Sequence, residues 1–162
     1  MFIIHKDKKG KLTSETSVNN YKIDIFDEKA KSDEVIFGGR ILNLVNDVAK
    51  IVAVAHAEVK CETIGIDFIR YFSLIKRDDI LICKAQVNHV WENLIEVGVK
   101  VMAEDFRTLE QKKILSAYFI FKSESGVEIP QIIPENESDK KRFIEAERRK
   151  KIREKRQSFS NP

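Results

Sequence analysis

One long segment, residues 37–57, restricts the possible folds of this chain more than any other part of the sequence. It reads FGGRILNLVNDVAKIVAVAHA and is apolar over most of its length. At about 100° per residue, its polar side chains fall within one sector of a helix roughly 120° wide, and apolar side chains cover the rest. The polar residues are Arg40, Asn43, Asn46, Asp47 and Lys50. The segment therefore predicts a mostly buried helix with one polar stripe, which could line a site, meet a partner subunit or face solvent.

Four segments after this helix have the composition of β-strands: Thr63 to Phe72, Ile80 to Val90, Leu94 to Ala103 and Ile114 to Lys122. The third is the clearest, because its β-branched residues alternate with glutamate, glycine and lysine, which is the period of a half-buried strand. The stretches between them, LIKRDD, WEN and DFRTLEQKK, are short and polar, as antiparallel connections require. We expect four consecutive antiparallel strands, and a further short strand within residues 13–25 that is followed by the loop KAKSDE.

The order of these elements favours one α+β fold. A helix that is apolar almost all round needs a sheet curved around it, because a flat sheet would cover only one side. This is the hotdog fold, which we expect at residues 13–125, after an N-terminal extension at 1–12 and before a linker and basic C-terminal helix at 126–162. A two-layer α+β sandwich of another topology is the alternative. The length of 162 residues suits one domain.

Charge is distributed unevenly along the chain. Residues 139–162 hold 10 Lys and Arg against 4 acidic residues, which leaves 19 against 22 in the rest. A basic helical tail of this kind could be a solvated or loosely docked helix, or it could attract the phosphate groups of a ligand. Phe143 is the only aromatic residue interleaved with the basic residues of this tail, so we expect no nucleic-acid partner.

Several features indicate a cytoplasmic chain. The N-terminal apolar run of three residues is too short for a signal peptide or a membrane span, so we expect no membrane partner. Cys61 and Cys83 have no spacing typical of metal ligands, and we expect reduced structural thiols and no metal.

Several motifs together resemble the acyl-CoA thioesterases of the hotdog superfamily. The similarity is greatest to the short bacterial acyl-CoA hydrolases and to each half of the brain-type cytosolic enzyme. It is carried by IFGGRILNLVND, AHA, TIGIDFIRYFSLIKRDDIL, AQVNHV, LIEVGVKV and the segment from AYFIFKSESG to the basic tail. The resemblance implies hydrolysis of a fatty acyl-CoA to free acid and CoA, without a further cofactor. It also implies a homo-oligomer built from dimers, and we expect a trimer of dimers.

The family pattern N-x-x-G-x-x-x-G-G-x-x-x-x-x-M-D assigns roles to positions in this chain. Its paired glycines match Gly38 and Gly39, its catalytic Asp corresponds to Asn46, its Asn to Lys31 and its loop glycine to Glu34. In the family, the Asp and the Asn come from opposite subunits of a dimer. Two carboxylates lie beside the replaced positions, and we name Asn46, Asp47 and Asp33 as the candidate catalytic residues.

Thioester hydrolysis needs a base or nucleophile and donors for the developing oxyanion. The free N–H groups and dipole of the helix start at Gly38 and Gly39 suit the second task, although a pair of glycines could merely permit a tight turn. Asp47 could serve as the base or could pair with Lys50 at helical spacing. Asn46 cannot be a base, but it can orient water or donate a hydrogen bond.

Two further residues complete the expected substrate-binding set. His56 lies near the helix C-terminus, where the dipole favours an imidazolium, and it could either contact the ligand or serve in capping and packing. Thr63 belongs to the motif shared with the thioesterases. We therefore expect an acyl-CoA thioesterase, with a non-catalytic hotdog protein that binds or senses acyl-CoA as the alternative.

Overall fold

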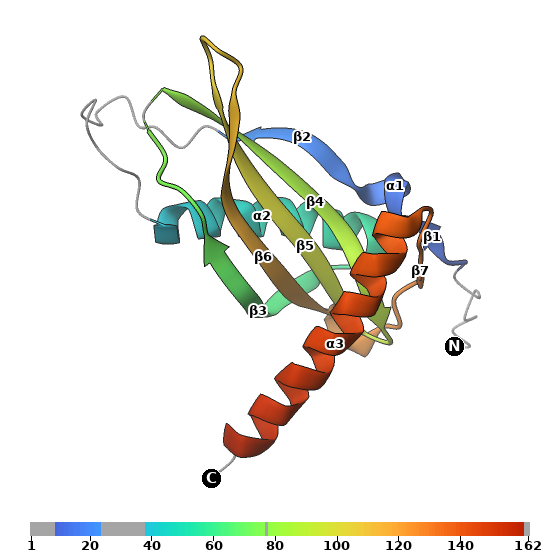
Figure 1. The fold of residues 1–162 in the computed structure, drawn as a ribbon. Coiled ribbons are helices and arrows are strands. Elements are labelled where there is room, and N and C mark those ends of the chain that lie inside the picture. The colour runs from blue at the N-terminus through green and yellow to red at the C-terminus, as the bar shows by residue number, and fades with distance from the viewer. Residues whose placement is uncertain (1–8, 24–37, 77, 161–162) are drawn as a thin grey trace.

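The computed structural model describes residues 9–23, 38–76 and 78–160, and it shows an antiparallel sheet curved around one long helix (Figure 1). The helix is α2, Gly38–Ala57. The sheet has the strand order β2-β4-β5-β6-β3. Its strands are β2 Val18–Ile23, β3 Cys61–Tyr71, β4 Asp79–Trp91, β5 Leu94–Asp105 and β6 Gln111–Ser123. The expected α+β hotdog arrangement is confirmed.

Short elements at the two ends of the chain meet beside this sheet. The strand β1, Lys11–Leu12, pairs in parallel with β7, Ile132–Ile133. Between β1 and β2 lies the single-turn helix α1, Thr13–Thr16, and the 3-10 turn η1, Glu124–Gly126, follows β6. The sequence predicted one short strand in residues 13–25, which corresponds to β2, and it missed the turn of helix before it. The loop KAKSDE lies outside the described residues.

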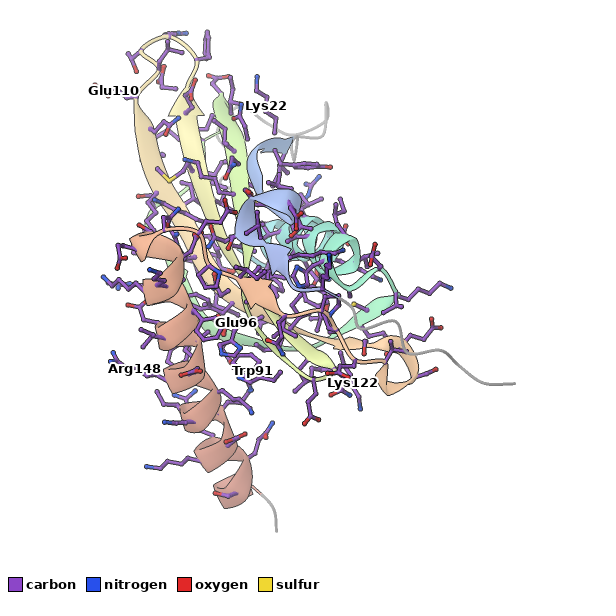
Figure 2. All side chains as sticks on the ribbon, turned by 90° about the vertical axis from the view of Figure 1, so that its right-hand side faces the viewer. Lys22, Trp91, Glu96, Glu110, Lys122 and Arg148 are labelled. Carbon is purple, nitrogen blue, oxygen red and sulfur yellow. The ribbon has the colours of Figure 1, made fainter. Side chains whose placement is uncertain are left out.

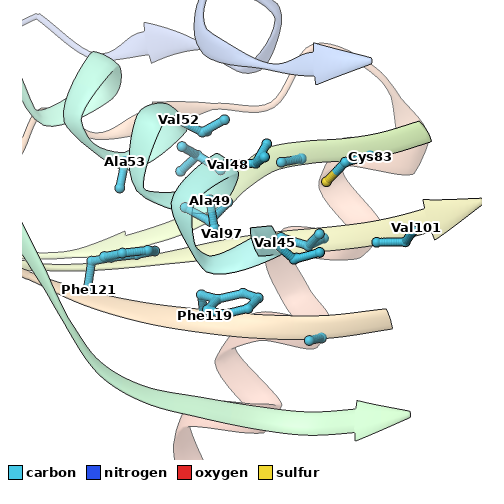
Figure 3. Packing of buried hydrophobic residues seen from close by; sticks show 14 of the residues in the cluster. Val45, Val48, Ala49, Val52, Ala53, Cys83, Val97, Val101, Phe119 and Phe121 are labelled. Atoms are coloured by element: carbon cyan, nitrogen blue, oxygen red, sulfur yellow. The ribbon is translucent and has the colours of Figure 1, made fainter. Parts of the chain in front are cut away.

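The core lies between α2 and the concave face of the sheet. Side chains of Val45, Val48 and Val52 point toward the sheet, where Phe119 and Phe121 from β6 meet them (Figure 3). Each of these side chains is at most 2% exposed, and complete burial of one such side chain contributes about 1.5–3 kcal/mol. This packing buries the side of α2 that faces the sheet, which is less of the helix than predicted, since Ile51 is 52% exposed.

Both cysteines are free and buried, as expected for structural thiols. Burial raises the pKa of Cys83 to about 12 and raises that of Cys61 as well, because the thiolate would lose its hydration in these surroundings. Both thiols are therefore protonated and poorly reactive at neutral pH.

All four predicted strands are present, but one expected adjacency is wrong. The stretch LIKRDD joins β3 to β4, yet β3 pairs with β6 at the far edge of the sheet and β4 pairs with β2 and β5. The connection therefore crosses from one edge of the sheet toward the other. Strand spacing along the chain predicts where strands occur, whereas their order depends on long-range pairing.

The C-terminal helix α3, Glu137–Ser160, lies across the outer face of the sheet, on the side away from α2 (Figure 1). His89 of β4 stacks between Trp91 and Phe143, with ring centroids 4.2 Å and 3.8 Å away. Trp91 and Glu96 lie on the side of α3 that faces the sheet, and Arg148 points away from it (Figure 2). The helix is therefore docked by specific contacts, and the expectation of a solvated or loosely docked helix is corrected accordingly.

Candidate active site

A hydrogen bond joins the polar stripe of α2 to the edge strand β3. Thr63 donates from Oγ1 to Asn46 Oδ1 over 2.7 Å. Asn46 lies in the middle of α2, and Thr63 lies near the start of β3, where it pairs with Phe121 of β6. Because the Asn46 carbonyl oxygen accepts this bond, the orientation of the amide is fixed and its NH₂ group remains as a donor. The structure therefore brings together two of the predicted site residues.

The predicted polar stripe is present on α2. Arg40, Asn43, Asp47 and Lys50 are exposed, and Asn46 is half-buried. The proposed structural pairing of Asp47 with Lys50 is not formed, since none of the ion pairs among the described residues joins them. The Asp47 carboxylate therefore faces solvent beside Asn46 in a single protomer.

The helix begins at the paired glycines, as the sequence predicted. Gly38 is the first residue of α2, and Gly39 is exposed. Gly39 precedes Asn46 by seven residues, which is about two turns or roughly 10 Å along the axis, so both face nearly the same side. The first N–H groups of a helix have no intrahelical acceptor and carry the positive end of its dipole. This end of α2 can therefore receive a carbonyl oxygen or an anion.

Three predicted positions cannot be placed relative to these groups. Asp33, Lys31 and Glu34 lie outside the described residues. The assignment of Asp33 as a candidate catalytic carboxylate therefore stays a prediction.

His56 is separated from this site, which favours the packing role over contact with the ligand. It follows Asn46 by ten residues, or about 15 Å along the helix. Its side chain has no exposed surface, and Nε2 donates to the Pro130 carbonyl over 2.6 Å. Burial lowers the pKa of His56, and this effect exceeds the opposing effect of the Pro130 hydrogen bond. The ring is therefore a neutral packing residue that fixes the segment before β7 against α2.

Sequence reasoning missed the exposed apolar side chains on α2 and on the edge strand β3, the strand to which Thr63 belongs. Seven large apolar side chains on α2, on β3 and just after β3 are between 38% and 68% exposed: Ile51, Ile64, Phe68, Ile69, Tyr71, Phe72 and Leu74. In the described sheet, β3 pairs with β6 on one side only, so its other edge is unpaired. The composition of β3 was visible in the sequence, but its edge position follows from long-range pairing and carried no local signal.

Comparison with known proteins agrees with this geometry. The thioesterase superfamily pattern matches residues 33–110, a range that contains the glycine pair, the polar stripe and β3. Protein VdlD of Helicobacter pylori is 30% identical over 127 residues, which cover 76% of this chain and 73% of VdlD. This chain belongs to the thioesterase superfamily. The human cytosolic acyl coenzyme A thioester hydrolase is 29% identical over 134 residues, which cover 78% of this chain and 35% of that longer protein.

Solved structures of thioesterases have the same fold. The acyl-CoA hydrolase from Bacillus cereus superposes with a TM-score of 0.85 at 26% identity, and the match covers 94% of each chain. An apo-hexameric acyl-CoA thioesterase superposes with a TM-score of 0.83 at 24% identity, covering 91% of this chain and 97% of that one. The match to these thioesterases extends through nearly the whole chain, so it includes α3 as well as the sheet.

Proposed function

We propose that this member of the thioesterase superfamily hydrolyses fatty acyl-CoA to free acid and CoA. The family and the relatives named acyl-CoA hydrolases support this reaction. The structural observation that carries the proposal is the hydrogen bond between Thr63 and Asn46, because it orients an amide donor at a half-buried position on the same side of α2 as Gly39. The acyl-CoA itself is the substrate, and the proposal includes no further cofactor.

The chemistry assigns two tasks to this region. Water attacks the acyl carbon and gives up a proton to a base, and the carbonyl oxygen acquires negative charge as the tetrahedral intermediate forms. The intermediate collapses by breaking the carbon–sulfur bond, which releases the CoA thiolate, and a thiolate is a good leaving group because thiols have a pKa near 8.5. Free N–H groups at Gly38 and Gly39 would stabilise the oxyanion.

We assign the remaining roles among Asn46, Asp47 and Asp33. Asn46 uses its NH₂ group to hold either the attacking water or the thioester oxygen, since an amide cannot accept the proton. The base is then Asp47, which is exposed one residue further along α2, or Asp33. A one-residue step turns a helical side chain by about 100°, so Asp47 and Asn46 point in different directions from the same helix. As the base, Asp47 would therefore act together with groups that a second protomer brings beside it.

We propose that the site is completed in a homodimer and that dimers assemble into trimers of dimers. The unpaired edge of β3 can extend the sheet into a second copy, and the exposed apolar side chains beside it would be buried there. The polar stripe of α2 then lies at the subunit interface, where a second copy can supply the groups that the site lacks in one protomer. A related fold is found in a hexameric acyl-CoA thioesterase, which is consistent with this assembly.

The proposed place of action is the cytoplasm. No helix in the described part of the chain is both long and apolar enough to cross a bilayer. The human relative is named a cytosolic enzyme, which supports the same location here.

Release of free thiol from a panel of acyl-CoA substrates tests the function. A thioesterase releases CoA with at least one acyl chain length, and the rate falls when Asn46 or Asp47 is replaced by alanine. If the purified oligomer binds CoA thioesters but hydrolyses none of them, the chain is a binding protein and the proposal is wrong.

A further inference from the structure

A hollow of about 430 Å³ lies on the outer face of the sheet, beside α3 and away from α2. Outward-facing side chains of β4, β5 and β6 form its floor, and one side of α3 forms a wall. Five cationic residues line it: Lys84, Lys100, Lys113, Arg142 and Arg149. Glu145 is the one carboxylate among the described residues that line it. The hollow is large enough for a small organic ligand, for which about 300–1,000 Å³ is typical.

Two of these lysines occupy directly opposed positions in the sheet. Lys84 of β4 is the register partner of Lys100 of β5, and both side chains are exposed. Directly opposed residues have Cβ atoms about 4.5–5.5 Å apart, and like charges at such positions repel each other. The pair therefore lowers stability unless negative charge lies between the two ammonium groups.

The protein does not supply that negative charge from its described residues. Arg149 is paired with Glu96 and Arg142 with Asp139. Neither Lys84 nor Lys100 takes part in any of the ion pairs found in the described part of the chain. Lys113 lies over the Phe72 ring at 4.4 Å, a contact that leaves its positive charge in place. Three lysines thus face the hollow against the single carboxylate of Glu145.

We propose that the hollow around Lys84 and Lys100 binds a soluble anion with at least two phosphate groups. Lysine binds phosphate as a point charge, and several cations around one cleft concentrate anions within it. The lining also contains neutral hydrogen-bonding side chains, including Gln86 and Ser116, which can contact phosphate oxygens without adding charge. Bound between the two lysines, the anion relieves their repulsion and stabilises the fold.

The phosphates of CoA have the same chemistry, so the source of the anion has to be distinguished. The hollow is walled by α3, which lies on the face of the sheet opposite α2 (Figure 1). Asn46 belongs to α2, and Thr63 donates its hydrogen bond to Asn46 on that other side. We therefore assign the hollow to a separate phosphate-bearing anion and not to a CoA bound at the thioester site. This inference stands independently of turnover, because it concerns binding only.

Calorimetric titration with inorganic pyrophosphate tests the site, using the full chain in its native oligomer. The double variant Lys84→Gln/Lys100→Gln removes the opposed charges. A matched control, Lys122→Gln/Lys151→Gln, removes two exposed lysines that do not line the hollow. We expect pyrophosphate to bind the parent and the control alike, with an affinity that falls as salt rises. In the Lys84/Lys100 variant, the affinity should fall at least tenfold.

Two accompanying measurements distinguish a loss of binding from a loss of folding and identify the source of the bound anion. Without pyrophosphate, the Lys84/Lys100 variant should melt at or above the parental Tm, because its repulsion is gone; with pyrophosphate, only the parent and the control should gain Tm. CoA should bind the parent equally well with and without saturating pyrophosphate. Competition between the two would overturn the assignment to a separate anion. Absence of pyrophosphate binding to the parent, or equal binding to all three proteins, would overturn the site itself.

Discussion

Arg149 on α3 holds the carboxylate of Glu96 on β5, although 53 residues separate them in the sequence. Arg149 donates from Nη2 to Oε1 over 2.7 Å and from Nε to Oε2 over 3.2 Å. Glu96 has no exposed surface, and Asn88 also donates to its Oε1 over 3.0 Å. A second pair, Arg153 to Asp67 of β3 at 2.6 Å, continues the attachment along α3. The C-terminal helix is therefore held to the sheet by charge-assisted bonds in places sheltered from water.

Replacing Arg149 by glutamine should destabilise the protein by about 3 kcal/mol, because removing one partner leaves a buried carboxylate without its counter-charge. Arg148→Gln is the matched control, since Arg148 is exposed and points away from the sheet; it should change stability by less than about 0.5 kcal/mol. Urea unfolding at equal protein concentrations measures both. Equal losses of unfolding free energy in the two variants would show that the pairing of Arg149 with Glu96 does not stabilise the protein.

Gly98 leaves room for the side chain that supports Glu96. A Cβ at Gly98 would lie 2.5 Å from Asn88 Nδ2, so Gly98→Ala should displace Asn88 from Glu96. We expect a cost of about 1–3 kcal/mol, the usual penalty for a buried polar group that loses its partner. Gly65→Ala on β3 is the control, because no heavy atom lies within 4 Å of a Cβ there. Thermal unfolding of the two variants should therefore separate them clearly, and similar melting temperatures would contradict the account.

Glu96 also shows how far the sequence predicted the fold. Alternation along residues 94–103 placed it correctly on the face opposite the core, because a strand's side chains alternate by local geometry alone. The same pattern suggested a solvent-facing glutamate, yet α3 covers it. That covering, like the pairing of β3 with β6, depends on contacts between distant segments, which no local period encodes. Helix α2 was predicted well because one continuous segment contains its whole pattern.

The candidate site was predictable to a similar degree. The polar stripe of α2 followed from helical periodicity, and the family resemblance named Thr63. The hydrogen bond between Thr63 and Asn46 joins β3 to α2 across 17 residues of sequence. Nothing in the sequence indicated that these two residues are in contact. The sequence left both ligand contact and packing open for His56, because a position near a helix C-terminus does not reveal whether later segments, here Pro130, will bury the ring.

His56 should make stability depend on pH below its ordinary pKa of 6.5. Burial lowers the pKa of the folded form, so the unfolded chain binds the proton first as the pH falls. The stability contributed by the neutral ring is complete above 6.5 and is lost as the pH falls through the lower folded value. Nε2 donates to Pro130, and Nδ1, where the proton would add, has no partner among the described residues.

Urea midpoints at pH 7.5 and 5.5 measure this effect. The parent should lose more stability between these values than His56→Gln, which lacks the titrating group, even though the variant is less stable at pH 7.5. Identical pH slopes in the two proteins would mean that His56 titrates alike in both states.

Ile51 tests the proposed dimer interface. This α2 side chain is 52% exposed beside the polar stripe, and an ammonium group there would be costly to bury against a second copy. Ile51→Lys should shift the protein toward monomers and reduce hydrolysis at the same time. Ile144→Lys on α3 is the control, since Ile144 has a similar exposure of 49% and lies nine residues before Arg153, the α3 residue that pairs with Asp67 of β3. Sedimentation analysis reports the mass; an unchanged oligomer with Ile51→Lys would place the interface elsewhere.

The most direct test of the account is the rate of thiol release from acyl-CoA by the parent, Asn46→Ala, Asn46→Asp and Asp47→Ala. We predict turnover by the parent, and at least a tenfold loss in Asn46→Ala, since it removes the amide oriented by Thr63. Asn46→Asp should keep or raise the activity because it restores the carboxylate of the family pattern. Asp47→Ala should lose about 10²–10⁴ if Asp47 is the base, with the melting temperature within a few degrees of the parental value. Parental rates in both alanine variants would contradict the site, and no turnover by the parent would contradict the function.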